Sequence, residues 1–143
     1  MCYRVELRQY ANPTFDAIGA TYLLTMEDST RREHYLQLLD KLRPTAEVTI
    51  LHNQGYKKCS KPSWVFNTST DLIHAYRQVC IDCQDIDEPV LILEDDAHVL
   101  SSKDQHFVDV NDFIGTHEFG VYSLGSFGSW DRSKDIGPHR KFR

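Results

Sequence analysis

The sequence predicts an α/β protein with three layers, in which a mainly parallel β-sheet lies between two layers of helices. Two observations lead to this prediction. Apolar runs suited to strands alternate along the chain with segments of helical periodicity. The apolar runs are also nearly continuous, as in parallel strands, because both faces of such strands are buried. We expect one domain, or the N-terminal half of one, with a core over residues 18–126 and an irregular basic tail over residues 127–143.

The first expected elements follow one another between residues 18 and 53. The run IGATYLLTM (18–26) suits a buried strand. A helix is expected next, because Thr30 and Glu33 fit a capping box and Pro44 ends the pattern. Its apolar residues recur at helical spacing: Tyr35, Leu38, Leu39 and Leu42. The run EVTILHN (47–53) is the second expected strand.

The second half of the core repeats this alternation. Residues 67–85 begin with several candidate N-cap residues and then place apolar side chains on one helical face: Leu72, Tyr76, Val79, Cys80 and Cys83. Residues 88–93 (EPVLIL) form the third expected strand, residues 101–117 a shorter helix, and residues 119–125 (FGVYSLG) a fourth strand. The first seventeen residues are an edge strand or an arm.

Composition and charge exclude several classes of protein. The chain has 143 residues, of which 41% are hydrophobic and 26% charged, as in an ordinary folded domain. A net charge of −5 gives no case for a nucleic-acid or anionic-membrane partner. No apolar run approaches the roughly 20 residues of a membrane helix, and the first residues are too polar for a signal peptide, so we expect a cytoplasmic protein. Cys80 and Cys83 lack a second cysteine pair, which favours packing over zinc binding.

Three adjacent acids begin where the third expected strand ends: Glu94, Asp95 and Asp96. Parallel sheets bind ligands beyond the carboxyl ends of their strands, and crowded carboxylates require a cationic partner. If strand geometry persists, Glu94 and Asp96 point to one side and can share Mg²⁺, Mn²⁺ or Ca²⁺, while Asp95 points to the other. His98 has the same parity and is a further candidate ligand or a sugar contact. The alternative is an exposed acidic turn.

These segments, in this order, resemble the N-terminal half of glycosyltransferase family 25. The resemblance covers about residues 20–126 and is carried by YLLTMEDSTRREHYLQLLDKL, VTILHN, VLILEDDA and VYSLG. It implies a GT-A-like fold and a hexosyltransferase that uses a nucleotide-diphosphate sugar, with a UDP-sugar favoured as donor. Members of the family act in lipopolysaccharide biosynthesis and in collagen galactosylation, so the acceptor is expected to be a glycan, a lipid-linked molecule or a protein.

The resemblance also implies roles for individual residues. Thr25 and Met26 would lie near the nucleotide, with Arg31 or Arg32 available to the diphosphate. The other reading of the two arginines is a solvated first helical turn. The acidic triad would be the equivalent of the DXD motif, with Asp96 as the likeliest direct ligand of Mn²⁺ or Mg²⁺ and Asp95 beside the cofactor.

The mechanism that the family implies is attack of an acceptor hydroxyl on the anomeric carbon, with inversion, which requires a general base. The residues do not identify that base, and Asp131 is a weak candidate. Two departures from the family bear on catalysis: Ser69-Thr70-Asp71 stands where the family usually has a Ser-His pair, and family members continue well beyond this length.

Two other functions stay open at this point. The chain is a non-catalytic nucleotide-sugar-binding remnant or one half of a split enzyme if it lacks a base. LILEDDAHVL also resembles the first strand of response-regulator receiver domains, in which an acidic pair binds Mg²⁺. A receiver, however, begins with this motif and needs a later strand that ends in aspartate, which the run GVYSLG does not supply.

Overall fold

The computed structural model describes residues 1–99, 104–124, 130–136 and 139–142, and of Asp104, residues 130–136 and residues 139–142 it describes the backbone alone. Four strands form one sheet in the order β1-β3-β2-β4: β1 (Tyr3–Gln9), β2 (Ala20–Met26), β3 (Glu47–Asn53) and β4 (Val90–Glu94). Strands β2, β3 and β4 are parallel, and β1 is an antiparallel edge strand paired with β3. The expected α/β class and mostly parallel sheet are therefore confirmed.

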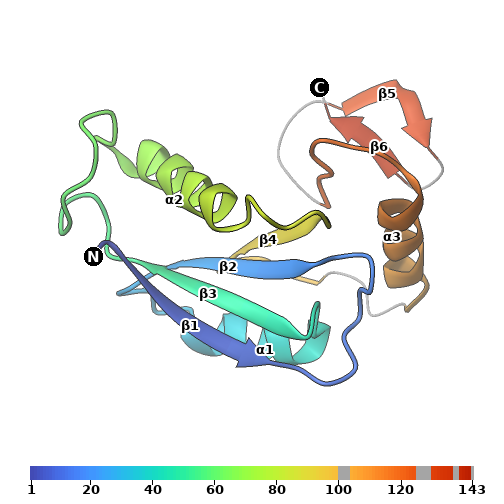
Figure 1. Cartoon of the computed structure of the whole chain (residues 1–143), viewed down its shortest axis with the longest axis horizontal. Helices are drawn as coiled ribbons and strands as arrows, with labels where there is room; N and C mark the ends of the chain where they lie inside the picture. Colours follow the sequence, from blue (N-terminus) through green and yellow to red (C-terminus); the bar gives the residue numbers. More distant parts are fainter. Residues whose placement is uncertain (100–103, 125–129, 137–138, 143) are drawn as a thin grey trace.

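Helices α1 (Arg32–Leu42) and α2 (Thr68–Asp82) cover opposite faces of this sheet (Figure 1). Alternate residues of β2 explain the arrangement. Leu23 packs with Tyr35 and Leu39 of α1, whereas Leu24 packs with Ala75 and Val79 of α2. Because both faces of β2 are buried, its sequence is apolar throughout rather than alternating.

A third helix, α3 (Asp104–Thr116), lies beside the sheet and packs against the segment before β2. Ile114 belongs to a cluster with Phe15 and Ile18, and Asn111 Oδ1 accepts hydrogen bonds from the backbone N–H groups of Asp16 and Ala17, each at 3.1 Å. No helix within the described residues is long and apolar enough to cross a membrane.

The ends of α1 and α2 are explained by their local sequence, except that the cap expected at the start of α1 does not form. Asn67 caps α2, and its side chain and that of Thr70 form a reciprocal capping box. Helix α1 ends before Pro44, as expected, but the capping box expected from Thr30 and Glu33 does not form. Its N-cap residue is Arg31, which makes no side-chain cap, so the first turn of α1 keeps uncapped backbone N–H groups.

Three further expectations are wrong. Residues 117–124 form no strand, because Phe119 and Tyr122 pack around Phe113 of α3 instead of joining a sheet edge. The tail expected to be irregular contains the antiparallel strands β5 (Trp130–Ile136) and β6 (His139–Phe142). Two residues of α2 that were expected to be buried are not: Cys80 is exposed and Leu72 is 38% exposed. The helix instead turns Asp71, Ala75 and Val79 toward the sheet.

The order of the parallel strands creates a topological switch point at β2. Helix α1 leads from β2 to β3 on one side, and α2 leads back across β2 to β4 on the other. The carboxyl ends of the three strands, at Met26, Asn53 and Glu94, lie at the same edge of the sheet. This edge is where open α/β sheets bind ligands.

Candidate functional site

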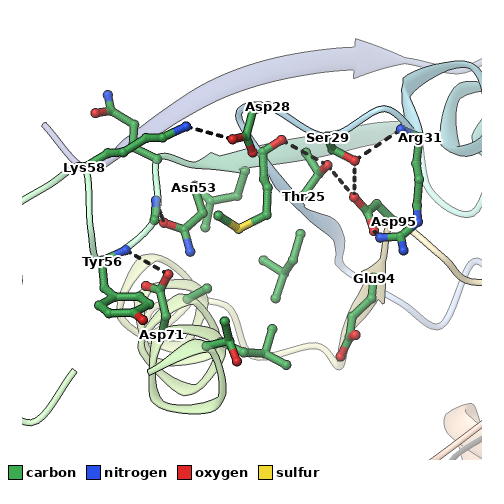
Figure 2. Close-up of a pocket in the computed structure, with 18 of the residues that line it drawn as sticks. Thr25, Asp28, Ser29, Arg31, Asn53, Tyr56, Lys58, Asp71, Glu94 and Asp95 are labelled. Carbon is green, nitrogen blue, oxygen red and sulfur yellow. Dashed lines mark hydrogen bonds and ion pairs between the residues drawn. The ribbon is translucent and has the colours of Figure 1, made fainter. Parts of the chain in front are cut away.

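A cavity of about 600 Å³ lies at the carboxyl ends of β2, β3 and β4 (Figure 2). The loops after these strands and the first turns of α2 supply its walls. Most of the lining residues bear polar or charged groups: Thr25, Asp28, Ser29, Thr30, Arg31, Asn53, Gln54, Tyr56, Lys57, Lys58, Thr68, Asp71, Glu94 and Asp95. Its size is that of pockets that hold small-molecule ligands.

Asp95 stands at the centre of a hydrogen-bond network in this cavity. Its Oδ2 accepts hydrogen bonds from the hydroxyls of Thr25 and Ser29, each at 2.7 Å, and its Oδ1 forms an ion pair with Arg31 Nη1 at 3.1 Å (Figure 2). The residue is only 8% exposed. The buried carboxylate therefore has a cationic partner within the protein, and that partner is Arg31.

Glu94 lines the same cavity but turns toward α2. Its Oε1 accepts a hydrogen bond from the hydroxyl of Tyr76 at 2.8 Å. Burial, followed by the bond to this carboxylate, raises the pKa of Tyr76 well above its ordinary value, so the phenol keeps its proton. Glu94 and Asp95 are thus held by two separate groups on two sides of the strand end.

The expected alternation of the acidic triad does not continue past Glu94. Strand β4 ends there, and Asp95 and Asp96 form a turn closed by a hydrogen bond from Ala97 N to Glu94 O at 3.0 Å. Asp96 is exposed and lies outside the cavity lining. His98 is also exposed, and its ring lies 4.6 Å from that of His34. The structure therefore places Asp95, not Asp96, with Glu94 in the cavity.

The two adjacent arginines point to different places. Arg31 lines the cavity, whereas Arg32 donates hydrogen bonds to both carboxylate oxygens of Glu6 in β1, at 3.0 and 2.8 Å. The Arg32 bond and, after it, the bond from His52 outweigh burial and lower the pKa of Glu6 from 4.5 to about 2. Thr25 and Met26 line the cavity, and their place beside a nucleotide stays a prediction. The side chain of Asp131 lies outside the described residues.

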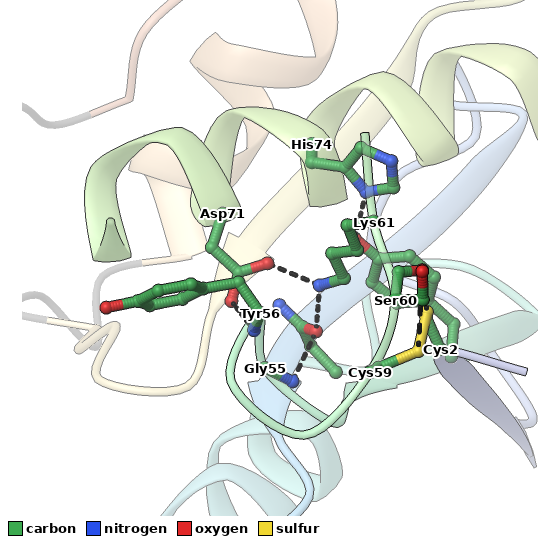
Figure 3. The surroundings of a disulfide bond; sticks show 10 residues. Cys2, Gly55, Tyr56, Cys59, Ser60, Lys61, Asp71 and His74 are labelled. Carbon is green, nitrogen blue, oxygen red and sulfur yellow. Dashed lines mark hydrogen bonds and ion pairs between the residues drawn. A yellow bond between two sulfur atoms is a disulfide. The ribbon is translucent and has the colours of Figure 1, made fainter. Parts of the chain in front are cut away.

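The wall formed by the loop between β3 and α2 is fixed by contacts that the sequence did not reveal (Figure 3). Lys61 forms a buried ion pair with Asp71, whose Oδ2 accepts a hydrogen bond from Tyr56 N at 3.1 Å. A disulfide joins Cys2 to Cys59, with Cα atoms 5.5 Å apart. Gly55 adopts a φ of +87°, the left-handed region that glycine tolerates, and its N–H donates to Asn53 Oδ1 at 2.9 Å.

The described residues do not form a ready metal centre. No group of three or more His, Cys, Asp or Glu side chains among them could hold an ion. Both oxygens of Asp95 already accept hydrogen bonds, and one oxygen of Glu94 accepts the bond from Tyr76. The Mn²⁺ or Mg²⁺ site expected at Glu94, Asp96 and His98 stays a prediction.

Comparison of the chain with protein-family models, with curated proteins and with solved structures found no match. The resemblance to glycosyltransferase family 25 therefore rests on the motifs quoted above.

Proposed function

We propose that this chain binds a nucleoside-diphosphate sugar in the cavity and transfers the sugar to an acceptor hydroxyl, as a GT-A-like glycosyltransferase. One observation carries the proposal: Asp95 and Arg31 meet in a cavity of about 600 Å³ at the carboxyl end of the central strands. In α/β sheets, nucleotides bind at this position. A UDP-sugar is the favoured donor because of the resemblance to family 25.

The chemistry of the lining supports an anionic ligand with an apolar part. Arg31, Lys57 and Lys58 are the groups of the lining that can contact a diphosphate. Four carboxylates line the same cavity, and two of them pair with Arg31 and Lys58. Leu24, Leu72 and the ring of Tyr56 offer apolar surface for a base or a sugar ring. Pockets that hold small-molecule ligands typically combine apolar surface with polar groups that orient the ligand.

In the proposed reaction, an acceptor hydroxyl attacks the anomeric carbon and the bond from that carbon to the diphosphate oxygen breaks. The departing diphosphate gains negative charge, which Arg31 would stabilise. A divalent ion, where one binds, would supply Lewis-acid stabilisation of the same group. The proton of the acceptor passes to a general base, for which Asp131 stays the candidate.

A second candidate function is donor binding without transfer. Its support is that each carboxylate of the cavity lining already has a partner: Asp28 with Lys58, Asp71 with Lys61, Glu94 with Tyr76, and Asp95 with Arg31. Among the described residues, the lining thus offers no unengaged carboxylate as a base.

Two measurements test these functions. A UDP-sugar should raise the melting temperature, because a ligand that binds only the folded state stabilises it. Release of UDP from UDP-glucose or UDP-galactose, with and without Mn²⁺, then separates transfer or hydrolysis from simple binding. If neither UDP nor any UDP-sugar shifts the melting temperature under either condition, the proposed function is wrong. Asp96→Ala reports whether the exposed acid takes part in a metal-dependent shift.

A further inference from the structure

We propose that Arg31 supplies the positive charge of the donor site and that a nucleoside diphosphate binds there without a divalent ion. This inference rests on the proposed function. The resemblance implies that Mn²⁺ or Mg²⁺ neutralises the negative charge of the diphosphate. We assign that neutralisation to a side chain of the protein instead.

The contacts of Asp95 are the first argument. Its side chain is only 11% exposed, and its oxygens accept two hydroxyl hydrogen bonds and one guanidinium hydrogen bond. An Mg²⁺ ion requires near-octahedral geometry and usually keeps several waters. Such an ion at Asp95 would compete with Arg31 for Oδ1, because Oδ2 already accepts both hydroxyl hydrogen bonds. The carboxylate is therefore arranged to orient an arginine.

The position of Arg31 is the second argument. Nη1 contacts Asp95, while 57% of the side chain stays exposed, in the lining of the cavity. A guanidinium group has several further N–H donors in a planar fork that matches phosphate oxygens. Asp95 can thus hold one edge of the group while another edge binds a diphosphate.

The start of α1 is the third argument. Arg31 is the N-cap residue of this eleven-residue helix. Its own N–H donates to Ser29 Oγ at 3.2 Å, and its side chain caps none of the N–H groups that follow. Ser29, Thr30 and Arg31, which lead into the helix, all line the cavity. Uncapped N–H groups and the positive end of the helix dipole favour an anion at this position. A diphosphate here would meet two sources of positive charge that need no metal.

Calorimetric titration with UDP, in EDTA and then in MnCl₂, tests the inference. We expect the same dissociation constant within about twofold in both buffers. A dissociation constant at least about tenfold lower in MnCl₂ would overturn the inference and leave the proposed function standing. An absence of binding in both buffers would overturn the proposed function itself.

Three variants sharpen the test, two arginine variants in EDTA and one variant of Asp95 in both buffers. Arg31→Ala should weaken UDP binding by about tenfold or more, since a charge-assisted bidentate contact is lost. Arg32→Ala is the matched control, because that arginine pairs with Glu6 outside the cavity, and it should bind UDP like the wild type.

Asp95→Asn separates the two models of the site. The amide oxygen can still accept the hydroxyl hydrogen bonds, while the negative charge is removed. We expect UDP binding that is weaker than in the wild type but stronger than in Arg31→Ala, because Arg31 keeps its charge and loses only the carboxylate that orients it. If Asp95 is instead a metal ligand, the variant loses Mn²⁺-dependent binding. A folded Asp95→Asn protein that no longer binds UDP would contradict our proposal.

Discussion

Lys61 and Asp71 form an ion pair whose side chains are only 1% and 5% exposed, beneath the loop that closes one wall of the cavity (Figure 3). Lys61 Nζ also donates to Asn53 Oδ1 at 2.6 Å and lies 4.8 Å from the centroid of the Tyr3 ring. The pair therefore ties the loop to β1, to the end of β3 and to α2. A buried charge is tolerated only with such a partner.

Removal of Lys61 should destabilise the whole fold. Lys61→Met leaves the Asp71 carboxylate buried without a cation, which typically costs about 3–5 kcal/mol of unfolding free energy. Lys58→Met is the control, because Lys58 and Asp28 are 64% and 66% exposed, and a solvated surface pair contributes little to stability. Urea unfolding of both variants measures the difference. Equal losses would show that the buried pair has no special role.

Reduction of the Cys2–Cys59 disulfide should lower stability and loosen the cavity wall. The bond closes a loop with a sequence separation of 57 residues, for which the chain-entropy model gives about 4 kcal/mol. We expect a lower melting temperature in dithiothreitol and faster hydrogen exchange at Gly55 and Tyr56. Cys2→Ser should behave like the reduced protein, whereas Cys80→Ser should not, because Cys80 is an exposed free thiol. An unchanged melting temperature in dithiothreitol would contradict this.

The same disulfide bears on the expected location. Disulfides form and persist in oxidising compartments and are rare in the cytosol. The Cys2–Cys59 bond therefore argues against the cytoplasmic location expected from the polar N-terminus.

Glu6 should make stability depend on acid pH. Arg32 and His52 lower its pKa to about 2, so its ionised form stabilises the folded state. A lowered pKa contributes stability fully above the ordinary value of 4.5, and the contribution is lost as pH falls from 4.5 toward 2. Its size is at most about 3 kcal/mol.

Comparison of Glu6→Gln with the wild type isolates this effect. The difference in unfolding free energy should be constant from pH 7 to about pH 5 and should shrink toward pH 2. Glu33→Gln, at an exposed position of α1, should differ little from the wild type throughout. A difference for Glu6→Gln that does not change with pH would contradict the assigned role of Glu6.

Local patterns in the sequence predicted what depends on local geometry. The buried stripe Tyr35, Leu38, Leu39 and Leu42 follows from helical periodicity, and the apolar run of β2 follows from burial on both faces. The sequence also placed the acids at the end of β4, where Glu94 and Asp95 line the cavity, since the carboxyl edge of a parallel sheet is fixed by topology.

The partners inside the site could not be predicted, because they depend on long-range contacts. Asp95 is separated from Arg31 by 64 positions, and nothing in the local sequence distinguishes Arg31 from Arg32. The direction of the Asp96 side chain depended on the residue at which β4 ends, because side chains alternate between the two faces of the sheet only while the strand continues. Cys2 and Cys59 likewise carry no local signal of their pairing.

The pair formed by Asp28 and Lys58 should limit the affinity of the cavity for anions. Lys58 Nζ lies 2.7 Å from Asp28 Oδ2, so this contact joins the loop after β2 to the loop after β3 (Figure 2). The bond from Lys58 lowers the pKa of Asp28, and the carboxylate is therefore charged at neutral pH. Its negative charge offsets that of the lysine in the cavity lining.

Asp28→Asn should therefore tighten UDP binding by roughly two- to fivefold at low ionic strength, because it frees Lys58 for a phosphate, and the gain should fade in high salt. Asp40→Asn changes the net charge equally but removes an exposed carboxylate that faces Arg8, away from the cavity, so it should leave affinity unchanged. Calorimetric titrations at two salt concentrations measure both. An equal gain in UDP affinity in the two variants would point to overall charge as the cause. Weaker UDP binding by Asp28→Asn would show that the Asp28 carboxylate positions Lys58 rather than competing for it.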